Sequence, residues 1–299
     1  MQRKFIYIIN PVSGRRTKKG LQEIIKEKTK EKDIPFYIFP SVASGDYSFL
    51  HPTIKEQKIT DVIIAGGDGT VSQVVSSLMQ FDLNFGVIPC GSGNGLALTA
   101  GISKRPGQAL NTIFNGTPSA IDGFYVNDQF ACMLCGLGFD AKVAHEFAKQ
   151  PTRGLAVYVK QTLRNLLSAK TFSFELQMKN IKFETEAYFI SIANSNQFGN
   201  NFTIAPQASL TDGLLDVVIV TSRNKLNFIL QTLRQVAGWN QLQSESLVDN
   251  KKSVIYFQTD RLNIINKTNA PFHIDGDPAE TVTRVKIKIL EKCFRLIQP

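Results

Sequence analysis

Three short segments in the first third of the chain contain the residue types that bind phosphate groups. They occupy residues 10–14, 66–70 and 91–95, and each holds at least one glycine. Glycines allow backbone amides to approach an anion closely, and a helix that begins at such a loop adds a favourable electrostatic field. These segments therefore predict a site for the phosphates of a nucleotide.

Asp68 is the acidic residue within these segments, and its charge would repel phosphate unless it were directed at a cation. In enzymes that transfer phosphoryl groups, such a carboxylate usually faces Mg²⁺ or the water molecules around it. We assign Asp68 this role. The competing interpretation is that Gly66, Gly67 and Gly69 only shape a tight turn and that Asp68 is a helix-capping or turn residue.

The segments around the loops alternate between strand and helix patterns. Short apolar runs precede the loops, while Val71, Val74, Val75 and Leu78 recur at helical spacing after the second loop. Such alternation predicts a parallel sheet with helices on both faces, whose carboxyl edge gathers the three loops. The expected strands are residues 5–9, 36–39, 61–65 and 85–88, and helices are expected around residues 21–25, 46–57, 71–79 and 96–100.

Beyond about residue 120 the pattern changes to antiparallel hairpins, with turn-forming pairs such as Asn127-Asp128 between apolar runs. We therefore predict a nucleotide-binding α/β domain over residues 1–121 and a β-sandwich acceptor domain over residues 122–299. The last strand or tail is free to pack back on the first domain. The expected strands are residues 120–126, 129–134, 172–178, 183–193, 214–220, 254–258, 261–265 and 281–290, with helices at 141–149, 155–167 and 226–236.

Several classes of protein are excluded or disfavoured by what the sequence lacks. No GxxxxGK[ST] loop and no HRD or DFG motif occurs, so a P-loop enzyme and a protein kinase are excluded. The first loop lacks the G-x-G-x-x-G fingerprint, which disfavours a dinucleotide dehydrogenase. Cys132 and Cys135 have no second Cys or His pair to complete a zinc site, so buried free thiols in a reducing compartment are expected.

Charge and hydropathy indicate partners and location. Thirty-four basic against twenty-five acidic residues leave a net charge of +9, which suits nucleotide phosphates or anionic lipid head groups. No zinc-finger or RNA-binding signature accompanies this charge, so no nucleic acid partner is expected. The N-terminus lacks a signal-peptide pattern, and no run of about twenty apolar residues occurs. A cytoplasmic protein in peripheral contact with an anionic membrane surface is expected.

The three loops also resemble those of a known family. Asn-Pro-Val-Ser-Gly at residues 10–14, Gly-Gly-Asp-Gly-Thr at 66–70 and Pro-Cys-Gly-Ser-Gly-Asn at 89–94 are similar to the diacylglycerol-kinase catalytic family, which includes sphingosine kinases and bacterial lipid kinases. Residues 205–216 and 273–277 resemble later family segments, so the likeness spans nearly the whole chain. It implies an N-terminal domain similar to NAD kinases and phosphofructokinases, a C-terminal β-sandwich, and an active cleft between them.

The resemblance also implies roles for individual residues. Relatives hold a structural Mg²⁺ in the segment matching residues 209–214, and they usually carry Asp-Gly-Glu where this chain has Asp-Gly-Asp at 275–277. Asp277 then matches the base that takes the proton of the acceptor hydroxyl, while Asp275 orients it or shares the task. The competing interpretation of the first segment is a plain turn at residues 212–213. That of the second is a hairpin turn with two exposed acids at residues 275–277. The implied catalytic residues are Asp277, Asp275 and Asp68; the implied ATP contacts are Asn10, Pro11, Val12, Ser13, Gly14, Ser41, Gly66, Gly67, Asp68, Gly69, Thr70, Val71, Ser72 and Ser92; and the implied Mg²⁺ ligands are Ser209, Asp212 and Leu214.

Together these features predict an ATP- and Mg²⁺-dependent lipid kinase of phospholipid metabolism that phosphorylates a lipid alcohol such as diacylglycerol. A sphingoid-base kinase is the closest alternative, because Gly-Ser-Gly-Asn at residues 91–94 is similar to sphingosine kinases. An NAD kinase and a non-catalytic nucleotide- or lipid-binding regulator stay open, as does a homodimer.

Overall fold

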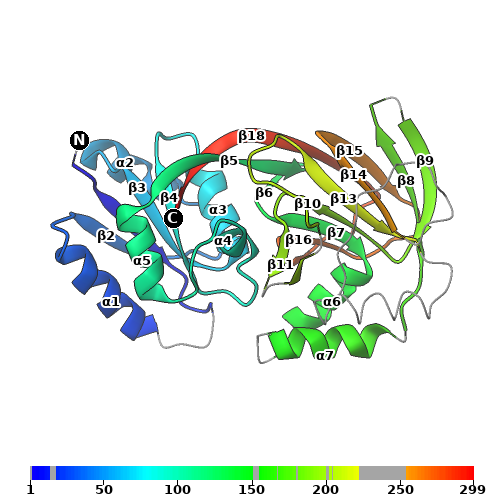
Figure 1. The fold of residues 1–299 in the computed structure, drawn as a ribbon, viewed down its shortest axis with the longest axis horizontal. Helices are drawn as coiled ribbons and strands as arrows, with labels where there is room; N and C mark the ends of the chain where they lie inside the picture. Colours follow the sequence, from blue (N-terminus) through cyan, green and yellow to red (C-terminus); the bar gives the residue numbers. More distant parts are fainter. Residues whose placement is uncertain are drawn as a thin grey trace.

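The computed structural model describes residues 2–13, 18–150, 155–166, 168–179, 181–199, 202–203, 205–221 and 254–299. An α/β half at the N-terminal end is followed by a β-sandwich, and long strands connect the two halves (Figure 1). The predicted fold class is confirmed. The helix expected at residues 226–236 lies outside the described residues. Within those described ranges, no helix has the length and apolar character needed to cross a bilayer.

Parallel strands form the centre of the N-terminal half, in the order β2 (Phe36–Pro40), β1 (Phe5–Ile9), β3 (Asp61–Gly66) and β4 (Asn84–Pro89). All residues of β1 and β3 are buried, as expected for strands covered on both faces. The expected helix at residues 46–57 is instead a short 3-10 turn followed by a separate helix. Pro52 lies in the first turn of that helix, where proline is favoured because its missing N–H is not needed. The helices and this turn are α1 (Lys18–Lys30), η1 (Ser48–Leu50), α2 (His51–Gln57), α3 (Asp68–Leu78), α4 (Gly95–Thr99) and α5 (Pro106–Asn115).

The C-terminal half packs two sheets face to face around a shared apolar core. One sheet continues from β4 through β18, β15, β8 and β9, and the other has the order β14-β13-β10-β7-β16-β17. Among the residues that the structure describes, two helices and a short strand pair complete this half. The elements are β5 (Thr117–Val126), β6 (Gln129–Ala131), β7 (Leu134–Gly138), α6 (Phe139–Ala148), α7 (Leu155–Leu166), β8 (Phe172–Met178), β9 (Ile181–Ala187), β10 (Phe189–Ala193), β11 (Gln197–Gly199), β12 (Phe202–Thr203), β13 (Leu215–Val220), β14 (Val254–Thr259), β15 (Arg261–Asn266), β16 (Phe272–Ile274), β17 (Asp277–Ala279) and β18 (Arg284–Gln298).

Two long strands, β5 and β18, run side by side through both halves (Figure 1). The end of β18 pairs in parallel with β4, at Arg295 and Leu296. The sequence pattern predicted a strand that stops at residue 290, which is too short. The register shifts between Leu290 and Phe294, and this irregularity interrupts the apolar alternation from which the strand was predicted. The predicted domain boundary after residue 121 falls within β5 and stays a prediction.

Two expected strands are each divided in the structure. The segment at residues 129–134 splits into β6 and β7, because the amides of Cys132 and Met133 donate hydrogen bonds to a buried carboxylate. The segment at residues 183–193 splits at Tyr188, where the chain passes from β9 in one sheet to β10 in the other. Its apolar residues continue across the break, so the pattern could not locate it.

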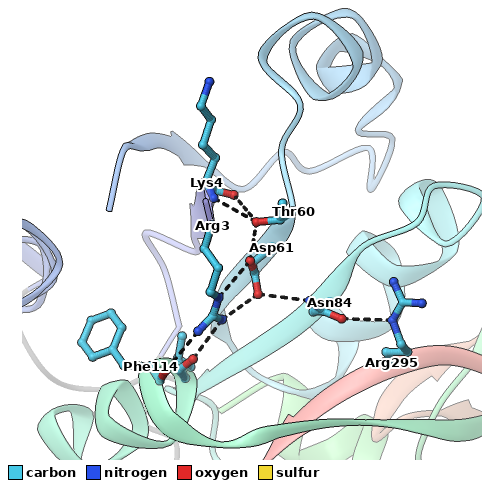
Figure 2. Close-up of polar contacts among 8 residues, drawn as sticks. Arg3, Lys4, Thr60, Asp61, Asn84, Phe114 and Arg295 are labelled. Atoms are coloured by element: carbon cyan, nitrogen blue, oxygen red, sulfur yellow. Dashed lines mark hydrogen bonds and ion pairs between the residues drawn. The ribbon is translucent and has the colours of Figure 1, made fainter. Parts of the chain in front are cut away.

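A polar network ties the amino ends of the central strands together, at the edge opposite the glycine loops (Figure 2). The buried carboxylate of Asp61 accepts hydrogen bonds from the Arg3 guanidinium, at 2.6 Å to Oδ1 and 3.2 Å to Oδ2. Arg3 also donates to the carbonyls of Ile113 and Phe114 at the end of α5, at 3.0 and 3.1 Å. The network therefore joins β1, β3 and α5, and Asn84 extends it to β4.

We expect Asp61→Asn to lower the free energy of unfolding by about 2–4 kcal/mol, since it leaves Arg3 without its charged partner at a buried position. Asp82→Asn is the matched control, because Asp82 pairs with Arg295 while its side chain is 90% exposed, and an exposed pair contributes about 0–1 kcal/mol. Urea denaturation measures both variants. Equal small losses would contradict a stabilising role for the buried pair.

Candidate active site

Contacts join the three glycine loops at the carboxyl edge of the parallel sheet. The side-chain amide of Asn10 donates a hydrogen bond to Thr70 Oγ1 at 2.8 Å, which connects the first and second loops. The second and third loops approach backbone to backbone, since a Cβ added at Gly91 would lie 2.6 Å from the Cα of Gly67. The predicted convergence of these loops is therefore present in the fold.

Asp68 is buried between the second and third loops. Its Oδ2 accepts a hydrogen bond from the Gly95 amide and its Oδ1 accepts one from the Leu96 amide, both at 3.1 Å. These amides belong to the first turn of α4, where a carboxylate is favourable. Asp68 thus caps α4, as the competing interpretation supposed, and its contact with Mg²⁺ stays a prediction. Burial raises the pKa of Asp68 to about 6, and the nearby Asp275 carboxylate adds to the rise.

The raised pKa of Asp68 predicts a pH-dependent stability. The folded protein binds this proton more tightly than the unfolded chain, whose value is near 3.8. The contribution is complete below pH 3.8 and is lost as the pH rises through about 6. We expect Asp68→Asn to flatten the decline in the free energy of unfolding between about pH 4 and 7, measured by urea denaturation without nucleotide or Mg²⁺. Asp128→Asn, at an exposed turn, is the control; identical pH curves for wild type and Asp68→Asn would contradict this assignment.

A tight turn at Asp275-Gly276 joins β16 to β17 in the sandwich. Both residues have positive φ angles, 50° and 81°, as a two-residue hairpin turn requires. The Asp275 carboxylate points inward and accepts hydrogen bonds from the amides of residues 132–134, at 3.0 to 3.3 Å, and from the hydroxyl of Ser72. Burial raises the pKa of Asp275, although these hydrogen bonds oppose the rise. The alternative of a hairpin turn is therefore correct, but that of two exposed acids is wrong for Asp275.

Asp277, at the start of β17, is exposed and its carboxylate lies against the second glycine loop. A Cβ added at Gly69 would meet Asp277 Oδ2, so the carboxylate lies directly against the backbone of Gly69. Gly69 belongs to the first turn of α3, whose N-terminus attracts anions. The structure thus brings a late carboxylate from the sandwich to the loop predicted to bind phosphate.

The other expected ATP contacts differ in their positions. Ser41 follows β2 at the same edge of the sheet, where its amide donates to the carbonyl of Ile9 at 3.0 Å. Ser72 is only 5% exposed, and its hydroxyl is bonded to Asp275. Gly14 lies outside the described residues. The remaining loop positions Pro11, Val12, Ser13 and Ser92 are exposed or half-buried, whereas Gly66, Thr70 and Val71 are buried.

The expected Mg²⁺ ligands lie in the turn that precedes β13. Asp212 is exposed, and its Oδ1 accepts a hydrogen bond from the Leu214 amide at 3.1 Å. Ser209 stands at the start of the same turn. The buried Asp122 holds the turn in place, since its Oδ2 accepts the Gly213 amide at 2.8 Å. Asp122 lies far from this turn in the chain, so its role was not predictable from local sequence.

Acidic side chains lie in this turn and beside it. Burial raises the pKa of Asp216 to about 7, and the charge of Asp212 adds to the rise. A hydrogen bond from Gln258 lowers this pKa and so opposes the rise. The carboxyl carbon of Glu291 would lie 3.1 Å from a Cβ at Gly213. Hard oxygen donors with excess negative charge suit Mg²⁺. Across the described ranges, no group of three or more His, Cys, Asp or Glu side chains is placed to hold a metal, so backbone carbonyls of Ser209 and Leu214 would have to contribute.

Two further contributors to the site were not identified from the sequence. Asn94 holds the third loop: its Oδ1 accepts the Gly91 amide at 2.7 Å, and its Nδ2 donates to the Gly91 carbonyl at 2.8 Å. Its left-handed φ of 57° is one that Asn tolerates, so an Asn between glycines was the available signal. The amides of residues 132–134 gave no signal, because backbone groups are present at every position.

Two family models match the chain. The diacylglycerol kinase catalytic domain matches residues 4–126, and the YegS C-terminal NAD kinase beta sandwich-like domain matches residues 134–298. A diacylglycerol kinase of Bacillus subtilis (strain 168) is 26% identical over 276 residues, which are 90% of this chain and 88% of that protein. A protein of Enterobacter sp. (strain 638) named "Probable lipid kinase YegS-like" is 28% identical over 266 residues, 86% of this chain and 84% of that protein.

Solved structures share the fold. The crystal structure of a diacylglycerol kinase from Bacillus anthracis str. Sterne has a TM-score of 0.73 at 19% identity, covering 99% of this chain and 97% of that chain. A second solved chain from the same organism reaches a TM-score of 0.81 at 20% identity, with the same coverage. At this level of identity the similarity supports the two-domain architecture.

Proposed function

Because the chain belongs to the diacylglycerol kinase catalytic family, with a YegS-type sandwich domain, we propose that it transfers the γ-phosphate of ATP to the hydroxyl group of a lipid such as diacylglycerol. The kinase class follows from the family models and from the names of the relatives. ATP as the donor and diacylglycerol as the acceptor are the proposed part. The observation that carries the proposal is the position of the Asp277 carboxylate against Gly69, at the N-terminus of α3.

In the proposed reaction, the glycine loops hold the phosphates and Asp277 takes the proton of the acceptor hydroxyl. Amides at the N-terminus of α3 attract the phosphates, and Asp277 lies at the same helix terminus. A hydroxyl held between Asp277 and the γ-phosphate would be deprotonated as it attacks in line. Asp275 is buried with hydrogen bonds to both oxygens, which supports Asp277 as the base.

Mg²⁺ bound near the phosphates would neutralise their negative charge, and a second, structural Mg²⁺ would be held by Asp212 with the carbonyls of Ser209 and Leu214. The ATP contacts implied by the family resemblance are proposed as well, except for Ser72, whose hydroxyl is bonded to Asp275. The active cleft is proposed between the two halves, where Asp277 of the sandwich meets the loop of α3. Peripheral contact with an anionic membrane surface is proposed from the net charge of +9.

A panel of acceptors tests the proposed function. Purified protein with Mg-ATP is incubated with diacylglycerol, monoacylglycerol, phosphatidylglycerol, sphinganine or NAD, and ADP release and phosphorylated product are measured. We expect a phosphorylated lipid. Phosphorylation of sphinganine alone would indicate a sphingoid-base kinase, phosphorylation of NAD alone would indicate an NAD kinase, and ATP binding without turnover would indicate a regulator. Sedimentation with anionic vesicles tests the membrane contact. Vesicle binding that does not change with salt concentration would contradict an electrostatic contact.

A further inference from the structure

Two residues of α3 contact the two carboxylates of the β16–β17 hairpin. Gly69 and Ser72 are three residues apart on the helix and therefore lie on one face. Asp277 lies against Gly69, while Asp275 accepts the hydrogen bond of the Ser72 hydroxyl. The helix that begins at the second glycine loop thus contacts the hairpin at two successive points.

The surroundings of Ser72 offer no equal replacement for its hydrogen bond. Ser72 is 5% exposed, and the Cys132 Sγ lies 3.0 Å from its hydroxyl. A thiol is only a weak hydrogen-bond donor, and burial raises the pKa of Cys132 well above its ordinary value, so the group stays uncharged. Without the hydroxyl, Asp275 Oδ2 would keep the Cys132 amide at 3.3 Å, a long hydrogen bond for a buried carboxylate.

The turn of the hairpin connects Asp275 to Asp277, so the position of one residue affects that of the other. β16 and β17 have three residues each, and Ile274 pairs directly with Asp277 across the turn. β16 also pairs with β7, whereas β17 is the edge strand of this sheet, so the position of β17 depends on the turn at Asp275 that joins it to β16. The Ser72 hydroxyl is the donor from α3, whereas the amides of residues 132–134 belong to the segment between β6 and β7.

We propose that Ser72 is a positioning residue: it holds Asp275 and thereby keeps Asp277 at the first turn of α3. Its hydroxyl is directed at the hairpin, so it is not a contact of ATP. The kinetic consequence rests on the proposed lipid-kinase function, because it assumes that Asp277 is the base. The structural consequence, an ordered hairpin against α3, does not depend on that function.

The test compares Ser72→Ala with Ser72→Thr, which retains the hydroxyl, and with Ser76→Ala, an exposed serine on the same helix. Hydrogen exchange is measured in peptides covering residues 272–279, and ATP affinity is measured by calorimetry. In Ser72→Ala we expect hairpin exchange about tenfold faster or more and ATP affinity within about twofold of wild type. With an active acceptor, kcat should fall about 10–100-fold at an unchanged KM for ATP. Ser72→Thr should restore these values, and Ser76→Ala should change none.

Unchanged hairpin exchange in Ser72→Ala would overturn the positioning role, and so would a tenfold loss of ATP affinity without faster exchange. If Ser72→Ala does not fold, Ser72→Cys replaces the hydroxyl with a weaker donor of similar size and is judged by the same readouts. If the wild-type protein phosphorylates no acceptor, the proposed function fails. Hairpin exchange and ATP affinity still decide the role of Ser72 in that case.

Discussion

We expect Asp277→Asn to lose phosphoryl transfer to lipid by about 10²–10⁴-fold in kcat while it binds ATP as well as wild type does. Asn has nearly the shape of Asp but cannot accept the proton of the attacking hydroxyl. Asp277 is exposed at the start of β17, so the substitution should change the free energy of unfolding by less than about 0.5 kcal/mol. Steady-state kinetics, ATP calorimetry and urea denaturation separate these effects.

Glu280→Gln is the matched control for this variant. Glu280 is an exposed acid directly after β17, so the same loss of charge occurs in the same hairpin but away from Gly69. We expect wild-type kinetics for it. If Asp277→Asn keeps more than about a tenth of wild-type kcat, the base is another group and the proposed role of Asp277 is wrong.

The second large effect is expected at the contact between the second and third glycine loops. A Cβ at Gly91 would lie 2.6 Å from the Cα of Gly67 and 2.9 Å from Asn94 Oδ1. Gly67 contributes backbone there, which cannot rotate away as a flexible side chain could, so the two loops must separate. We expect Gly91→Ala to weaken ATP binding about 10–100-fold and to destabilise the fold by about 1–3 kcal/mol. Calorimetry and urea denaturation measure the two losses.

Gly20→Ala provides the control for this substitution. Gly20 lies in α1, and a Cβ there would meet nothing within 4 Å. Because Ala favours the helix over Gly, this variant should gain about 0.5–1 kcal/mol and bind ATP normally. Wild-type ATP affinity in Gly91→Ala would show that the close approach of the loops is not needed for nucleotide binding.

Elements with a strong local pattern were predicted well. Strand β1 is a short apolar run, and β3 is an apolar run that follows Asp61. The spacing of Val71, Val74, Val75 and Leu78 is that of one helix face, so neighbouring residues alone identify these elements. The glycine loops follow from the same local information. Their convergence follows from topology, because parallel strands end at one edge.

Features that depend on distant partners were missed. The break between β6 and β7 arises because Cys132 and Met133 donate their amides to Asp275, which is far along the chain. The passage from β9 to β10 occurs within a continuous apolar run. The extension of β18 depends on its pairing with β4 and β5 beyond an irregularity. No local pattern contains these partners.

The sequence by itself predicted the two-part architecture and the phosphate-binding character of the glycine loops, since composition and short-range spacing carry that information. The two late aspartates became candidates for catalysis through the resemblance to a known kinase family. Only the tertiary structure decided where each of these carboxylates lies. Asp275 is buried among amides and the Ser72 hydroxyl, while Asp277 reaches Gly69. The physical reason is that the role of a carboxylate depends on its burial and on the donors around it, and these come from segments distant in the chain.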